Sequence, residues 1–242
     1  MAKSPKLKEE TEMTNWNAWN TNSTETPKED VSVWGTRRVT PKRSADTQQS
    51  VSGQTEMQIS HVYKKLPVFT TILPNHIELN KYLKQVILEH RQNNPETTES
   101  NVKAWHSSWQ THVENPKFQP LIDIVLNACK FISHGYFQTQ DLDFSVFNCW
   151  ASMYEKGEHT IKHSHFPSDF ACTYYVDLEP GSSPIIFETP NNDGVNDDNK
   201  PLIIQPQNGM LAIWPALMHH EVPPTETKRM VVAMNIDKGY RT

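Results

Sequence analysis

A succession of short apolar segments, which fills the chain after Gln138, constrains its fold more than any other feature. The segments are LDFSVFNCWASMYEKG, ACTYYVDLEPG, SPIIFETP, KPLIIQPQNGMLAIWP and KRMVVAMNID. Each contains β-branched or aromatic residues and is bounded by Gly, Pro, Asn or Asp. This pattern is typical of the strands of an antiparallel sandwich or barrel.

Two helical patterns precede these strands. In IELNKYLKQVILEHRQNN the apolar residues recur at near-helical spacing, and FQPLIDIVLNACKFISHGYF repeats the pattern. The apolar face expected for the second helix consists of Leu121, Ile124, Val125, Ala128 and Phe131. Before both, HVYKKLPVFTTILP predicts one or two strands. Helices first and strands last indicate an α+β arrangement.

Residues 1–57 differ from the rest of the chain. They are rich in Thr, Ser, Asn, Lys and Glu, so they offer too little apolar surface to offset the entropy of ordering. We therefore expect a polar tail at 1–57, disordered or bound to a partner, and a folded domain at 58–242. Trp16, Trp19 and Trp34 interrupt the tail. They are either chance aromatics or anchors that dock on a protein partner.

Charge, hydropathy and cysteine content limit the binding partners and the cellular compartment that we expect for this protein. A net charge of -5 and a pI near 6.1 give no electrostatic reason to expect nucleic-acid binding. No apolar run approaches the roughly 20 residues that span a bilayer, and the charged start lacks the apolar core of a secretory signal. Three cysteines without CxxC spacing favour a reducing, cytoplasmic location.

Histidines in two stretches of the strand-rich half are candidate metal ligands. In an extended strand, His163 and His165 point to the same face and can converge on one ion. Asp169 is the alternative second ligand if the intervening Phe-Pro-Ser segment turns. About 55 residues later come His219 and His220, of which only one can point inward.

Arg229 follows His220 by nine residues, in a strand dominated by apolar side chains. An arginine buried in such a strand needs an anionic partner, because an unpaired buried charge is costly. A dicarboxylate ligand would provide one through a bidentate pair. The other interpretation is an arginine at the start of the strand with its guanidinium in water.

From Asn101 to Ile236 the sequence resembles the 2-oxoglutarate/Fe(II)-dependent oxygenases, specifically the small prolyl-hydroxylase-like group of bacteria and phages. The resemblance includes the Asn-Val-x-x-Trp-His-Ser segment that starts at Asn101, the His-x-His pair and Gly209-x-Leu211 before Trp214-Pro215. It continues through His220 and Arg229 to Asn235-Ile236, with order and spacing kept throughout. The first 57 residues fall outside it.

The resemblance implies a double-stranded β-helix, or jelly-roll barrel, supported by the two N-terminal helices. It also implies an Fe(II) ion, with 2-oxoglutarate and O₂ used to hydroxylate an unidentified substrate. His163 would be the first iron ligand and His220 the distal one, and Arg229 would pair with the far carboxylate of 2-oxoglutarate. The remaining implied contacts to this cosubstrate come from Tyr174 or Tyr175, and from Asn235.

The chain departs from the family at the second ligand, where most members have Asp or Glu and this sequence has His165. Either three histidines bind the iron, or His165 lies behind the ligands and Asp169 supplies the carboxylate. Alternation along the strand favours His165, whereas charge balance favours Asp169. A third possibility is a degenerate site that binds metal poorly.

Two other functions are compatible with the sequence. One is a structural or assembly protein, associated with a virion, that keeps the barrel and docks through its tryptophan-bearing tail. The other is a cupin-like protein that binds iron through three histidines without 2-oxoglutarate. For an oxygenase we expect a cytoplasmic location, in a bacterial host if a phage encodes the protein.

Overall fold

The computed structural model describes residues 36–37, 59–60, 66–139, 142–188 and 201–240. The chain divides into two units, Met1–Lys64 and Lys65–Thr242. In the first, β1 (Thr36–Arg37) pairs antiparallel with β2 (Ile59–Ser60). The remainder of the expected 1–57 tail, including its three tryptophans, lies outside the described residues. None of the helices described is long and apolar enough to cross a membrane.

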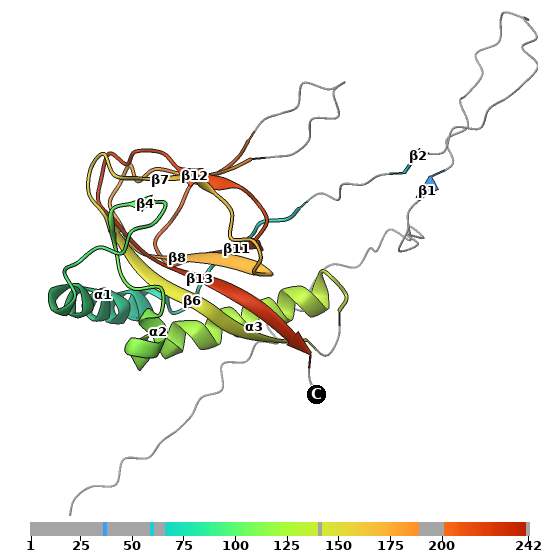
Figure 1. Cartoon of the computed structure of the whole chain (residues 1–242), viewed down its shortest axis with the longest axis horizontal. Helices are drawn as coiled ribbons and strands as arrows, with labels where there is room; N and C mark the ends of the chain where they lie inside the picture. The colour runs from blue at the N-terminus through green and yellow to red at the C-terminus, as the bar shows by residue number, and fades with distance from the viewer. Residues whose placement is uncertain (1–35, 38–58, 61–65, 140–141, 189–200, 241–242) are drawn as a thin grey trace, which may run out of the picture. The chain divides into compact units, whose positions relative to one another are not determined.

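The second unit is built on two antiparallel sheets (Figure 1). The order of the six-stranded sheet is β3 (Phe69–Ile72), β11 (Met210–Pro215), β8 (Phe170–Leu178), β13 (Arg229–Tyr240), β6 (Leu142–Tyr154), β5 (Trp105–His106). The order of the five-stranded sheet is β10 (Leu202–Ile204), β9 (Ile185–Phe187), β12 (His220–Val222), β7 (His159–His163), β4 (Val102–Lys103). From β6 onward the chain passes back and forth between the sheets, with β9 and β10 successive in the smaller one, so residues distant in sequence become neighbours. The predicted antiparallel strands are confirmed.

Two long helices cover the six-stranded sheet on the side away from β7 and β12 (Figure 1). They are α1 (His76–Asn93) and α3 (Gln119–Gly135), and the short α2 (Thr111–Glu114) and η2 (Pro116–Phe118) lie between them in sequence. The predicted apolar face of α3 included Phe131, and this prediction was wrong because Phe131 is 73% exposed. At about 100° per residue, Phe131 lies roughly 140° from the centre of the buried stripe. Ile122, Cys129 and Ile132 complete that stripe instead.

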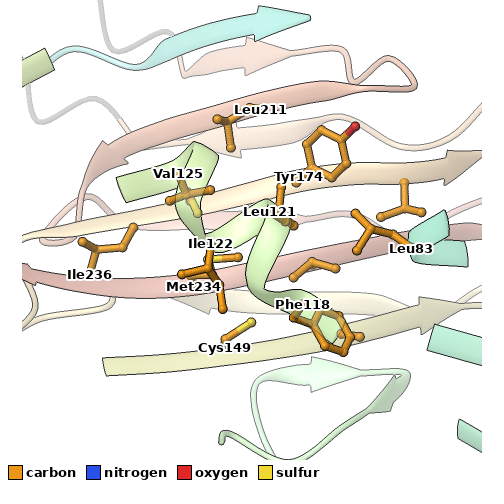
Figure 2. Close-up of a cluster of buried hydrophobic side chains, with 14 of the residues drawn as sticks. Leu83, Phe118, Leu121, Ile122, Val125, Cys149, Tyr174, Leu211, Met234 and Ile236 are labelled. Atoms are coloured by element: carbon orange, nitrogen blue, oxygen red, sulfur yellow. The ribbon is translucent and has the colours of Figure 1, made fainter. Parts of the chain in front are cut away.

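A hydrophobic core fills the space between these helices and the six-stranded sheet (Figure 2). Leu121 and Val125 of α3 meet Tyr174 of β8 and Met234 of β13 there. Because side chains alternate along a strand, the even-numbered residues of β13 from Met230 to Ile236 enter this core. The odd-numbered side chains point to the other face of the sheet.

A second core lies between the two sheets and forms the surroundings of the candidate site. Its members include Tyr154, Tyr175, Phe187, Trp214 and Val231. They come from β6, β8, β9, β11 and β13, so both sheets contribute to it. Tyr154, Tyr175 and Trp214 bring polar atoms into this core.

Candidate metal and cosubstrate site

Three histidines from separate parts of the five-stranded sheet and its loops converge at one point. His163 ends β7 and pairs in register with His220, the first residue of β12. His165 follows in the loop after β7, where its backbone N–H donates to the carbonyl of Ala216 at 2.7 Å. One ring nitrogen from each histidine lies within 4.8 Å of the other two. This spacing allows the three rings to bind a single ion.

Hydrogen bonds orient two of the rings. His163 Nδ1 donates to the carbonyl of Ile161 at 2.7 Å, and His220 Nδ1 donates to the carbonyl of Met218 at 3.2 Å. Because a carbonyl can only accept, Nδ1 carries the proton in both rings and Nε2 keeps its lone pair. A backbone partner of this kind is the usual support of a metal-binding histidine.

Burial and the neighbouring rings keep the three imidazoles neutral, and a neutral imidazole is the form that binds a metal ion. Burial and the neighbouring His163 ring lower the pKa of His220 to about 3. Burial lowers the pKa of His163, and it lowers that of His165 well below its ordinary value, with His220 and His163 adding to the effect. Three imidazoles this close cannot all be protonated, so their lone pairs are available to a cation at neutral pH.

Aromatic rings surround the histidine cluster and fix its shape. The ring centroid of Trp214 lies 4.9 Å from that of His220, and Phe187 lies 5.6 Å from the same histidine. On the other side, Trp150 of β6 is 5.8 Å from His165. The sequence interpretation missed these three residues as parts of the site. Their inward-facing positions on predicted strands were the available signal, but it did not distinguish them from ordinary core residues.

The other two metal candidates lie outside the cluster. His219 is exposed, so of the adjacent pair only His220 points inward, as alternation requires. Both carboxylate oxygens of Asp169 bind Lys238, at 2.6 Å to its Nζ and 2.9 Å to its backbone N–H. The group of potential ligands therefore contains His165 and not Asp169.

Arg229 is buried in the core between the sheets, with 3% of its surface exposed. Its Nη1 donates to the carbonyl of Ser183 at 2.9 Å, and its Nε has no partner. The guanidinium carbon lies 5.1 Å from the ring centre of Tyr154 and 5.4 Å from that of Tyr175. No ion pair to Arg229 is found among the described residues, so an anionic ligand is the partner that the site lacks.

The two adjacent tyrosines face opposite sides of β8. Tyr174 points toward the helices, and its hydroxyl donates to Asn80 of α1 at 2.6 Å. Tyr175 points between the sheets beside Arg229, with which its buried hydroxyl interacts, but no group accepts a hydrogen bond from that hydroxyl. Of the pair, Tyr175 is therefore the one that can donate to a ligand of Arg229.

Asn235 lies on the same face of β13 as Arg229 but six residues further along, near the middle of the strand. Six residues of extended chain place them roughly 20 Å apart. Its amide nitrogen donates to Asn148 of β6 at 3.2 Å, and its buried Oδ1 has no partner. The structure thus groups Tyr154, which the sequence interpretation missed, with Arg229 and separates Asn235 from it.

Comparison with known proteins gives a family match over part of the chain and a shared fold. Residues 148–235 match the model of a family described as putative 2OG-Fe(II) oxygenase, and this span includes all three histidines and Arg229. No curated protein sequence matches the chain.

Three solved structures share the fold at low sequence identity. A Pseudomonas putida prolyl-4-hydroxylase is 15% identical with a TM-score of 0.51. The aligned region covers 71% of this chain and 93% of that protein. A Trichoplax adhaerens prolyl hydroxylase, in complex with a hypoxia-inducible factor peptide, is 16% identical with a TM-score of 0.51. The aligned region covers 69% of this chain and 83% of that protein. The non-haem α-ketoglutarate-dependent epimerase SnoN, from nogalamycin biosynthesis, is 11% identical with a TM-score of 0.51. The aligned region covers 72% of this chain and 80% of that protein.

The matched region, residues 148–235, therefore resembles the 2OG-Fe(II) oxygenases, a family of oxidoreductases, and the solved structures show that the fold is shared with prolyl hydroxylases. Members of this family use Fe(II) and 2-oxoglutarate. The residues present fit both groups. Three neutral imidazoles lie at ligand spacing, and a buried arginine and a buried tyrosine hydroxyl have unpartnered polar atoms in the adjoining core. The expected resemblance and cofactors are confirmed.

Proposed function

We propose that the chain is a hydroxylase in which His163, His165 and His220 hold Fe(II) between the two sheets. Arg229 anchors the far carboxylate of 2-oxoglutarate, and Tyr175 donates its hydroxyl to the same cosubstrate. When bound, the iron and 2-oxoglutarate supply the oxidising chemistry with O₂. The observation that carries the proposal is the joint presence, around one core, of a three-histidine cluster and an unpaired buried arginine.

The arrangement of the two sheets supports a double-stranded β-helix as the framework. The chain crosses from β6 to β7, back to β8, across to β9 and β10, and back to β11, before β12 and β13 repeat the crossing. The strands that carry His163 and His220 lie in the smaller sheet and the strand that carries Arg229 lies in the larger one, which supports this proposal. The helices α1 and α3 support the outer face of the larger sheet in this proposal. We retain the boundaries proposed from the sequence, with a 1–57 tail and a 58–242 domain.

The protein residues perform three tasks in this proposal. The histidines hold the metal in their neutral forms, since their depressed pKa values keep Nε2 free at neutral pH. Arg229 fixes the orientation of the cosubstrate because its guanidinium is planar and held over two tyrosine rings. Trp214 and Phe187 exclude water from the metal side of the core.

His165 rather than Asp169 is the second ligand in this proposal. Using Asp169 would break two contacts with Lys238 and would require the loop after β7 to move. His165 requires no such change, because its ring already lies 4.8 Å from that of His163 and 5.0 Å from that of His220.

The decisive experiment is an anaerobic titration with Fe(II) and then 2-oxoglutarate. The chelate should give a weak visible charge-transfer band, and admission of air should then produce succinate. The His220→Ala variant should lose the band, whereas the exposed neighbour variant His219→Ala should keep it. An unchanged band in His220→Ala would refute the proposed site.

Arg229→Gln distinguishes the oxygenase from a cupin-like dioxygenase. The oxygenase should lose affinity for 2-oxoglutarate and keep the metal, whereas a protein that does not use 2-oxoglutarate should be indifferent. The substrate is unidentified. No comparison supports the alternative of a virion assembly protein, and the tryptophan-bearing tail on which that alternative depends lies outside the described residues.

A further inference from the structure

The three histidines of the cluster are not oriented by the same kind of contact. His163 and His220 each donate an Nδ1 hydrogen bond to the carbonyl two residues earlier in the chain. Among the residues that the structure describes, none forms a hydrogen bond with the ring of His165, although its backbone N–H is fixed on the carbonyl of Ala216. A ring that is free to rotate must be ordered when it binds a metal, and this ordering weakens binding.

An aromatic contact takes the place of the missing hydrogen bond at His165. The ring centroid of Trp150 lies 5.8 Å from that of His165, with 34° between the ring planes. Trp150 is itself buried, and two further rings pack against it. His106 stacks on it at 5.5 Å and 15°, and Trp109 meets it edge-on at 4.9 Å. Trp150 therefore contacts the third ligand while two other side chains restrict its own movement.

The backbone on both sides of Trp150 is held by the segment that carries these two rings. Ser107 donates its N–H to the carbonyl of Ala151 at 3.0 Å, and its Oγ accepts from the N–H of Ala151 at 2.9 Å. On the other side, the N–H of Cys149 donates to the carbonyl of Trp109 at 3.0 Å. The segment begins at the Trp-His-Ser motif and precedes the residues that the family model matches, so that match assigns it no role.

We propose that Trp150 is a positioning residue of the metal site: supported by His106 and Trp109, it holds the imidazole of His165 in the orientation that binds the ion. This inference rests on the proposed metal site and gives the Trp-His-Ser motif a task there. Packing does for His165 what a backbone carbonyl does for the other two histidines. A change of shape at Trp150 should therefore affect the metal only through His165.

The test measures the binding of Zn(II) alone to the full chain, by competition with a chelator, so it needs neither 2-oxoglutarate nor turnover. Since loss of a contact that orients a ligand weakens metal binding about 10- to 100-fold, we expect about a tenfold loss in Trp150→Leu. Trp150→Phe keeps an aromatic ring beside the imidazole and should stay within about threefold of the natural chain. The matched control is Trp105→Leu, because this equally buried tryptophan contacts His90 and Arg91 instead, and its Zn(II) affinity should not change.

A second background tests whether Trp150 acts through His165. His165→Ala leaves two histidines that bind Zn(II) more weakly, and adding Trp150→Leu should then change the affinity by less than about twofold, because effects within one pathway are not additive. Equal losses in both backgrounds would show a general disturbance of the core and overturn the inference. An unchanged Zn(II) affinity in Trp150→Leu, with circular dichroism showing a folded protein, would overturn it as well.

One measurement on the metal-free natural chain needs no variant. Nuclear Overhauser effects should connect the indole protons of Trp150 with the imidazole protons of His165. Their absence would overturn the inference even if Trp150→Leu does not fold. Failure of the natural chain to bind Zn(II), or an unchanged Zn(II) affinity in His165→Ala, would instead remove the proposed metal site on which the inference rests.

Discussion

His106 gives the most quantitative prediction outside the proposed ligands. It is fully buried in β5, its ring stacks at 5.5 Å on Trp150, and Trp109 lies 4.6 Å away. Its Nδ1 donates to the carbonyl of Ser107, but Nε2 is buried without a partner. Burial lowers the pKa of His106 to about 4, from an ordinary value near 6.5.

A histidine with a depressed folded-state pKa destabilises the fold as the pH falls. The unfolded chain takes up the proton near pH 6.5, while the folded chain resists it down to about pH 4. Linkage across that interval gives a loss of about 3 kcal/mol in the free energy of unfolding between pH 7 and pH 4. Phenylalanine would keep the stacking on Trp150 and would not titrate.

We therefore expect His106→Phe to match the natural protein within about 1 kcal/mol at pH 7, because a lost hydrogen bond is offset by removal of an unsatisfied nitrogen. At pH 4 the variant should be more stable by about 3 kcal/mol. Urea unfolding of both proteins at pH 7, 5.5 and 4, without metal, measures the difference. The difference isolates His106 because the other titrating groups are common to both. A gap that stays constant across this pH range would refute the reasoning.

Three further results are expected at the proposed site. Arg229→Met should weaken 2-oxoglutarate binding at least a hundredfold, as measured by calorimetry with Mn(II) present, because a charged bidentate contact is lost; a smaller than tenfold effect would contradict the anchor role. Tyr175→Phe should weaken the same binding about two- to tenfold, the contribution of one hydrogen bond, with unchanged metal affinity; an unchanged 2-oxoglutarate affinity would exclude the contact. Metal at a hundred times its dissociation constant should raise the melting temperature by about 5–10 °C in His219→Ala but not in His220→Ala; equal shifts would argue against His220 as a ligand.

The fold could be predicted from the sequence wherever apolar residues recur with a regular spacing. Both long helices and the strand-rich second half appear where the apolar patterns placed them, because burial on one face imposes those patterns. The buried face of α3 was misjudged at Phe131, since the helix carries more apolar residues than its stripe can bury. The short β4, β5 and β12 carry too few residues to show a pattern of their own.

The site was predictable where local alternation decides the direction of a side chain. Alternation requires that only one residue of His219–His220 and one of Tyr174–Tyr175 face the core between the sheets, and the structure has this arrangement. It could not say which of the two did so, because that depends on strand register. The contacts of Asp169 with Lys238 and of Arg229 with Tyr154 join residues 69 and 75 positions apart, respectively. Only the three-dimensional pairing of strands determines such contacts.

The polar atoms left without partners indicate where ligands belong. Arg229 Nε, the Tyr175 hydroxyl and Trp214 Nε1 are buried in or beside one apolar core, and each unsatisfied group costs about 1–3 kcal/mol. The ladder itself is irregular there, since the β12–β7 register shifts between His220 and Val222. Departures of this kind from local consistency concentrate at functional sites. Because nearby described residues do not satisfy these groups, an anionic ligand that accepts hydrogen bonds would stabilise the fold as well as complete the site.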